Sequence, residues 1–254
     1  MVRSFSYTLL ITWILLSISC KTNFIATQTD TQNISVSENS LPVDSQLVEQ
    51  YLPQKKILEK DMGRVISKTN VELVKQKPES GLTNFLADLL LDEGKKYSLL
   101  NNLQINPEIS YFNYGGIRTS LPKGDINVGK IFELMPFENE MVFIQLTGVQ
   151  LQQFYNKVAE FGGESVGGVR FVISNEKAKN VFINGEMLDP QKKYWLVTND
   201  YSANGGDDLE VFTHRLEFIG SNKKIRDIII SNFEERQKRG EVISEILDGR
   251  IKNE

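Results

Sequence analysis

The amino-acid sequence predicts an α+β domain built on a mixed sheet. Three observations support this prediction: short apolar runs rich in β-branched and aromatic residues, longer segments with apolar residues at three- and four-residue spacing, and glycine-rich breaks between them. The strand-like and helix-like segments follow one another without the regular alternation of a doubly wound parallel sheet. We therefore expect a single domain of the α+β class.

Branched and aromatic side chains pack well on a pleated surface, so runs enriched in them are typical of strands. In chain order the predicted strands lie at 63–67, 71–74, 109–112, 141–146, 169–173, 181–183 and 195–197. Asn184-Gly185 follows the sixth run and predicts a hairpin turn. The third and seventh runs each end in a polar loop that contains paired glycines.

Four segments are predicted as helices, at about 80–96, 126–134, 147–158 and 223–237. The first begins at Ser80 and the third at Thr147, and both residue types are favoured at helix N-caps. Leucines and aromatic residues then recur at helical spacing and form one apolar face in each. Gly94 is expected to end the first helix, and Pro136 the second.

The N-terminal segment resembles a bacterial lipoprotein signal. Arg3 precedes an apolar run at about 5–16, which is too short to span a bilayer, and small or polar residues then lead to Cys20. We expect residues 1–20 to be a signal peptide ending at a lipidated Cys20, although Ser17 stands where leucine is usual. A plain signal peptide with an incidental cysteine is the alternative. Both interpretations predict export, and the first predicts a lipid anchor in the bacterial cell envelope, on the periplasmic side or the cell surface.

The rest of the chain divides by composition. Residues 21–53 are polar and predict a flexible tether, in which a helix beginning near 47–57 is interrupted by Pro53. Residues 54–254 are long enough for one domain with a substantial core. Acidic residues outnumber basic ones, 33 to 29, which argues against a nucleic-acid-binding surface. Cys20 is the only cysteine, so we expect neither disulfides nor a cysteine metal site.

Two glycine-rich loops carry residue types suited to a small polar, aromatic ligand. One is Asn113-Tyr-Gly-Gly-Ile-Arg118, which offers an amide and a guanidinium; the other is Tyr201-Ser-Ala-Asn-Gly-Gly-Asp207, which offers a ring and a carboxylate. Glycines permit positive φ and close approach of the backbone. The single histidine, His214, is expected at the surface, and the adjacent acids Asp207-Asp208 are poor support for a cation site.

Five segments occur in a fixed order along the chain: Glu79-Ser-Gly-Leu-Thr-Asn84, Asn113-Tyr-Gly-Gly-Ile-Arg118, Leu134-Met-Pro-Phe137, Val166-Gly-Gly-Val169 and Tyr201-Ser-Ala-Asn-Gly-Gly-Asp207. Each is a weak signal alone. Together they resemble the C-terminal, substrate-binding domain of the 5'-nucleotidase family, over residues 63–251. The resemblance implies a single α+β domain with a mixed sheet like that of the family.

The resemblance also implies substrate-binding roles for five residues. Phe137 and Tyr201 match two rings that sandwich the nucleobase. Asn113 matches an asparagine at the base edge, Asp207 a carboxylate that accepts hydrogen bonds from the ribose hydroxyls, and Arg118 an arginine directed at phosphate. Structural alternatives remain for each: core packing for the two rings, a brace within its loop for Asp207, a turn position for Asn113 and a surface ion pair for Arg118.

Two departures from the family pattern bear on function. A second arginine of many members is replaced here by Gln76, flanked by Lys75 and Lys77, which lack bidentate geometry. The metallophosphatase domain of the family holds two metal ions with Asp, His and Asn, and no motif of that kind is found in this sequence. We therefore expect no catalytic residue, no cofactor and no metal in this chain. The divalent metal pair is expected only in a partner metallophosphatase.

The leading hypothesis is the nucleotide-binding part of a split 5'-nucleotidase, which presents its substrate to a separate metallophosphatase chain. Its partners are a nucleotide or nucleoside, that second chain, and the membrane through the lipid on Cys20, without nucleic acid. The alternative is a stand-alone exported lipoprotein that binds nucleosides or nucleotides. A metallophosphatase without its own C-terminal domain, encoded beside this chain, would favour the first. A scaffold that has lost its ligand fits poorly with the retained site residues.

Overall fold

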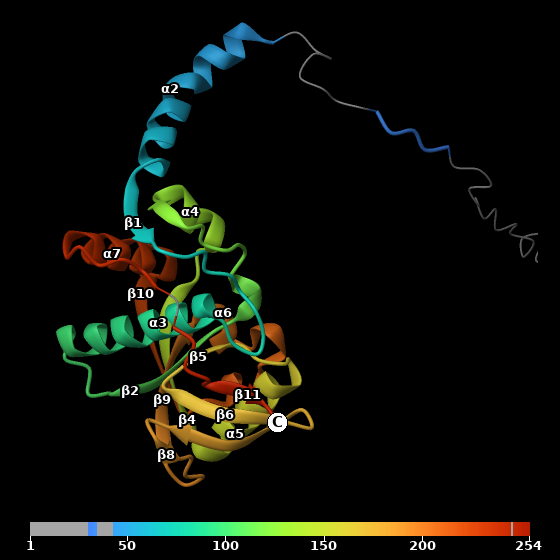
Figure 1. Ribbon diagram of the computed structural model, residues 1–254, viewed down its shortest axis with the longest axis vertical. Coiled ribbons are helices and arrows are strands. Elements are labelled where there is room, and N and C mark those ends of the chain that lie inside the picture. Colours follow the sequence, from blue (N-terminus) through green and yellow to red (C-terminus); the bar gives the residue numbers. More distant parts are fainter. Residues whose placement is uncertain (1–29, 35–42, 245) are drawn as a thin grey trace, which may run out of the picture. The chain divides into compact units, whose positions relative to one another are not determined.

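The computed structural model describes residues 30–34, 43–244 and 246–254 (Figure 1). The expected lipidation residue Cys20, the rest of the signal segment and part of the predicted tether lie outside these residues. The chain divides into two units, Met1–Glu49 and Gln50–Glu254, and the second contains the sheets and cores described below. No helix within the described ranges is long and apolar enough to cross a membrane.

The first described helix, α2 (Ser45–Met62), extends across the expected limit between tether and domain. Pro53 lies inside this helix, whereas the sequence predicted an interruption there. Proline removes one backbone hydrogen-bond donor and crowds the preceding turn. None of the side chains of α2 is buried, so no packing opposes the small adjustments that accommodate the ring.

Three sheets organise the domain. The central sheet has the order β10 (Glu217–Lys224), β4 (Glu140–Thr147), β9 (Lys193–Asn199), β2 (Pro107–Phe112), β5 (Ser165–Gly167). A second has the order β11 (Ile251–Asn253), β6 (Val169–Ser174), β7 (Lys177–Ile183), β8 (Glu186–Met187), and β1 (Val65–Thr69) pairs with β3 (Gly124–Asn127). Strands β2 and β9 are parallel and their other central-sheet neighbours antiparallel. The predicted α+β class with a mixed sheet is therefore confirmed.

The central-sheet strands β2, β4 and β9 are buried on both faces. Along β4, Met141 and Phe143 belong to one apolar cluster, whereas Val142, Ile144 and Leu146 belong to another. This division follows from the alternation of side chains along a strand. The first cluster packs under α3 (Gly81–Leu100), α4 (Val128–Leu134) and α7 (Ile225–Lys238), and the second lies between α5 (Gly148–Glu160) and the second sheet. Figure 1 shows α3, α4 and α7 in one half of the domain and β6, β8 and β11 in the other.

Both predicted N-caps are confirmed. The hydroxyl of Ser80 accepts from the backbone N–H of Thr83, and that of Thr147 from Gln150, each within a reciprocal capping box. The prediction that Gly94 ends its helix is wrong, because α3 continues to Leu100. A Cβ at this position would lie 3.1 Å from a methyl carbon of Val197. Gly94 thus serves close packing of α3 on the sheet.

Further differences concern strands. Residues 71–74 form only an isolated bridge, between Leu73 and Leu121. The strands β3, β5, β10 and β11 were not predicted from the sequence. Most side chains of β10 are exposed, so its residues lack the apolar alternation of a half-buried strand. The strand β11 is three residues long and pairs in parallel with β6, some eighty residues earlier in the chain.

Candidate functional site

The order of strands brings the two glycine-rich loops together. Because β2 and β9 are parallel neighbours, Asn113 after β2 and Tyr201 after β9 emerge at the same edge of the sheet. The strand β4 is antiparallel to β9, with Met141 opposite Asn199, so the residues that precede β4 lie at this edge as well. Phe137 is among them. Three segments far apart in sequence thus converge at one edge.

A cavity of about 290 Å³ lies at this convergence. All five predicted site residues line it, together with two glycines and one further asparagine: Asn113, Gly115, Gly116, Arg118, Phe137, Asn139, Tyr201 and Asp207. Asn139 was not identified from the sequence. Its position two residues after Phe137, immediately before β4, is the signal that could have found it.

The two aromatic residues are half-exposed and not part of the core. Phe137 and Tyr201 each keep 46% of their surface accessible, and neither belongs to an apolar cluster. The guanidinium carbon of Arg118 lies 5.9 Å from the centre of the Phe137 ring. Exposed rings on the wall of a cavity are available for stacking, and the alternative of core packing does not apply to either.

A hydrogen-bonded chain of side chains fixes the polar wall. Asn199 Nδ2 donates to Asn113 Oδ1 (3.0 Å), and Asn113 Nδ2 donates to Asp207 Oδ2 (2.8 Å). The Tyr201 hydroxyl donates to the other oxygen, Asp207 Oδ1 (3.0 Å), and this bond raises the pKa of Tyr201. Asn113 and Asn199 are buried. The carboxylate of Asp207 therefore does brace its loop, while remaining exposed at the cavity.

The paired glycines of the second loop have different roles. Gly205 adopts φ 91°, a conformation that glycine reaches without strain. Gly206 instead provides space, since a Cβ there would lie 2.4 Å from a carbon of the Tyr201 ring. Asp207 follows at φ 54°, ψ 41°. Such left-handed geometry in a non-glycine residue is uncommon, and it aims the Asp207 carboxylate back at Asn113 and Tyr201.

The basic residues of the site are not equivalent. The guanidinium of Arg118 donates once, to the carbonyl of Gly115 (3.1 Å), and has no ion-pair partner among the described residues. Lys75 Nζ donates to the carbonyls of Tyr114 (3.1 Å) and Ile117 (2.6 Å), beneath the loop that carries Arg118. Burial, with the nearby positive charge of Arg118 as the second cause, lowers the pKa of Lys75.

Lys77 is also engaged. Its Nζ donates to the carbonyl of Phe161 (2.6 Å) and pairs with Glu164 (3.5 Å). Gln76 between the two lysines is exposed. Arg118 is thus the basic residue whose side chain lines the cavity. Lys75 and Lys77 instead donate to backbone carbonyls of the surrounding loops.

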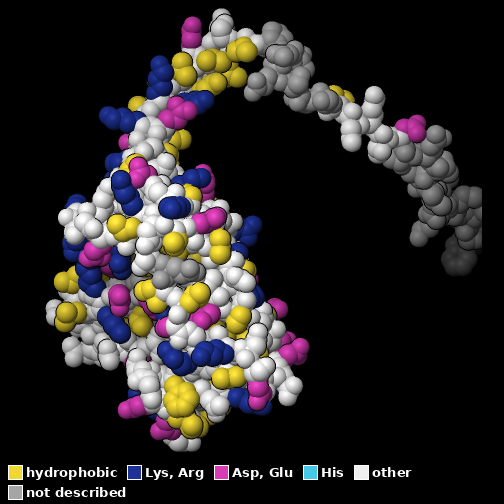
Figure 2. Space-filling view, in the orientation of Figure 1, with side chains coloured by type: hydrophobic (Ala, Val, Ile, Leu, Met, Phe, Trp, Pro, Cys, Tyr) yellow, Lys and Arg dark blue, Asp and Glu magenta, His cyan; other side chains and the backbone are white. Residues whose placement is uncertain are grey.

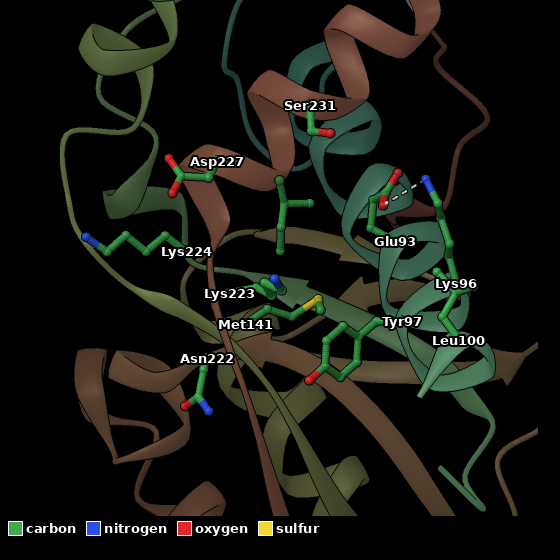
Figure 3. A pocket seen from close by; sticks show the side chains of 11 residues that line it. Glu93, Lys96, Tyr97, Leu100, Met141, Asn222, Lys223, Lys224, Asp227 and Ser231 are labelled. Atoms are coloured by element: carbon green, nitrogen blue, oxygen red, sulfur yellow. Dashed lines mark ion pairs between the residues drawn. The ribbon is translucent and has the colours of Figure 1, made fainter. Parts of the chain in front are cut away.

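Another cavity, of about 490 Å³, lies between α3, β10 and α7 (Figure 3). Its wall includes the side chains of Tyr97, Met141 and Lys224, and Lys96 forms an ion pair with Glu93 there. None of the predicted site residues contributes to it. The smaller cavity at the strand ends combines rings, amides, a carboxylate and a guanidinium, so we regard it as the candidate site.

Within the described residues, no group of three or more His, Cys, Asp or Glu side chains is arranged to hold a metal ion. His214 is exposed at the end of a 3₁₀ turn (Glu210–His214), in agreement with its expected surface position. On the face of the domain seen in Figure 2, basic and acidic side chains are interspersed.

Comparisons with known proteins show the family of this chain. The family model described as "5'-nucleotidase, C-terminal domain" matches residues 62–214. The trifunctional nucleotide phosphoesterase protein YfkN of Bacillus subtilis (strain 168) is 31% identical over 252 residues, which covers 89% of this chain and 16% of YfkN. Protein UshA of Escherichia coli (strain K12) is 34% identical over 98 residues, which covers 37% of this chain and 18% of UshA. This chain therefore spans less than a fifth of each of these two relatives.

Solved structures share the fold. The 5'-nucleotidase precursor from Thermus thermophilus superposes with a TM-score of 0.68 at 27% identity, covering 84% of this chain and 44% of that one. A putative 5'-nucleotidase from Staphylococcus aureus superposes with a TM-score of 0.65 at 15% identity, covering 85% of this chain and 46% of that one, which supports the fold alone. From the family match and the shared fold, this chain belongs to the 5'-nucleotidase C-terminal domain family.

Proposed function

We propose that this chain binds a nucleotide or nucleoside and presents the phosphate to a separate metallophosphatase. The observation that carries the proposal is that one cavity is lined both by two half-exposed rings, Phe137 and Tyr201, and by a hydrogen-bonded amide and carboxylate. Stacking of a base on an aromatic ring contributes on the order of 1–3 kcal/mol and tolerates different bases. The rings supply most of the affinity and the polar wall selects orientation.

The polar residues have distinct roles in this proposal. Asp207 has both oxygens engaged once, and each retains a lone pair for a ribose hydroxyl. Asn113 is held from both ends of its amide and presents a fixed edge to the base. Arg118 uses one N–H on the Gly115 carbonyl, and its remaining donors suit the oxygens of a phosphate.

The metal pair and the attacking water belong to the partner in this proposal. Its support is that no group of three or more His, Cys, Asp or Glu side chains among the described residues is arranged to hold a metal ion. The lipid on Cys20, proposed from the sequence, would hold the chain at the cell envelope. A second candidate is a stand-alone binding protein for nucleosides. It is favoured because Lys75 and Lys77 donate to backbone carbonyls, which leaves Arg118 as the basic side chain at the cavity for a phosphate.

The test is phosphate release from AMP, measured with this chain alone, with a metallophosphatase that lacks its own C-terminal domain, and with both together. We expect phosphate release to be accelerated only in the mixture, and we expect Arg118→Ala to reduce this acceleration. Binding of adenosine and AMP without any acceleration would favour the stand-alone binding protein. Metal-dependent hydrolysis by this chain alone, or failure to bind either ligand, would contradict the proposal.

A further inference from the structure

A buried carboxyl group lies directly beneath the candidate site. Glu164 is 7% exposed, and its Oε2 accepts a hydrogen bond of 2.5 Å from the backbone N–H of Tyr114. Tyr114 begins the 3₁₀ turn (Tyr114–Gly116) between Asn113 and Arg118. One acid outside the ligand cavity thus holds the turn between two residues that line it.

The chain is built to bring Glu164 to this position. It follows Gly162 (φ 76°) and Gly163 (φ 112°), at which the chain turns sharply after α5. A Cβ at Gly163 would lie 2.2 Å from the carbonyl oxygen of Pro78, so only glycine fits there. This close approach places Glu164 beside Lys77, whose Nζ lies 3.5 Å from Oε1.

The turn is held from both of its sides by charged groups. Glu164 accepts a hydrogen bond from the backbone N–H of Tyr114, and Lys75 donates to the carbonyls of Tyr114 and Ile117. The ammonium groups of Lys75 and Lys77 lie 4.1 Å and 4.9 Å from the centre of the Tyr114 ring. The position of Arg118 therefore depends on a small ionic cluster and not on the turn alone.

We propose that Glu164 is a positioning residue of the nucleotide site, which fixes the Asn113–Arg118 turn through the Tyr114 amide and Lys77. This inference rests on the proposed function for its ligand, but its structural part can be measured without one. Ionised Glu164 accepts the amide hydrogen bond more strongly than the neutral acid and attracts Lys77. Protonation weakens both contacts and releases the turn.

Burial and the groups that face Glu164 determine the pKa of its carboxyl group. Burial is the largest influence and raises its pKa from 4.5 to about 7, while the Tyr114 amide and Lys77 act in the opposite direction and Asp207 raises it. Lys75 and the hydroxyl of Tyr111 also face this carboxyl. The turn is consequently expected to tighten as pH rises through neutrality, and ligand affinity is expected to rise with it.

The ligand-free test follows the Tyr114 backbone amide by NMR between pH 5.5 and 8.5. Its chemical shift should titrate with a midpoint near 7 in the unaltered chain, and the titration should vanish in Glu164→Gln. Lys77→Met should move the midpoint upward, because a stabilising positive charge is lost. Glu108→Gln is the matched control, since Glu108 also pairs with a lysine, Lys192 at 2.7 Å, but lines no part of the site.

The ligand test measures adenosine binding over the same pH range, because adenosine, unlike AMP, carries no phosphate that titrates there. We expect affinity to rise about three- to tenfold from pH 6 to pH 8 in the unaltered chain and to stay flat in Glu164→Gln. A Tyr114 amide that fails to titrate, or a pH profile that survives Glu164→Gln, would overturn the inference. Absence of adenosine binding with a normal Tyr114 titration would refute the proposed function and leave the positioning role of Glu164 supported.

Discussion

The replacement Gly206→Ala tests how the Tyr201 ring is held at the cavity. In the structure a Cβ at position 206 would lie 2.4, 2.5 and 2.6 Å from three carbons of that ring. Ordinary contacts of a Cβ lie between 3.4 and 4 Å, so the ring must move by about 1 Å or rotate away. Either response breaks the 3.0 Å bond from the Tyr201 hydroxyl to Asp207 and removes the ring from its stacking position.

The expected loss is the stacking contribution of one ring, about 1–3 kcal/mol, which corresponds to a Kd for adenosine weakened about 5- to 150-fold. Isothermal titration calorimetry measures it directly. Gly220→Ala is the matched control, because its Cβ would come no closer than 3.8 Å to another residue and it lies outside the cavity. An affinity for adenosine that is equal in Gly206→Ala and the control would refute the role assigned to the ring.

Three further predictions concern stability and can be measured by urea unfolding. Gly94→Val should lower the unfolding free energy by about 1–3 kcal/mol, because the added carbons overlap Val197 and Phe143. Arg250→Ala should cost about 1–3 kcal/mol, since this buried guanidinium donates twice to Asp88 and once to the carbonyl of Val166, and these acceptors lose their partner. An unchanged urea midpoint in either variant would contradict the reason given for it. The raised pKa of Glu164 reflects the cost of burying its charge, so the fold loses stability as pH rises from 4.5 through about 7, even though the ionised carboxylate holds the Tyr114 amide more strongly. Relative to the unaltered chain, Glu164→Gln should therefore gain up to about 3 kcal/mol between pH 4.5 and pH 8, and a constant difference would contradict this.

Much of the fold could be predicted because local signals agreed with tertiary packing. The caps at Ser80 and Thr147 and the apolar spacing after them identified α3 and α5. Gly94 misled because a glycine in a helix also permits close approach of a strand, and the sequence does not distinguish the two uses. The strand β10 escaped notice because it lies at the edge of the central sheet with most of its side chains exposed.

The five site residues were expected from the family resemblance, and the structure places their motifs at the ends of strands or just before one. Their mutual contacts could not be predicted, since the parallel pairing of β2 with β9 is a property of the whole sheet. The support of the loop was equally hidden. Nothing near Glu164 in the sequence indicates that its carboxylate holds the Tyr114 amide, because Gly163 and Pro78 meet only in the folded chain.

Calorimetric titration of the described domain with adenosine and with AMP, in the unaltered chain and in Tyr201→Ala, tests the central claim most directly. The account predicts that the unaltered chain binds both ligands, that AMP binds more tightly because Arg118 contacts its phosphate, and that Tyr201→Ala weakens both at least about fivefold. Equal affinities in the two proteins, or no binding to the unaltered chain, would contradict a nucleotide site between Phe137 and Tyr201.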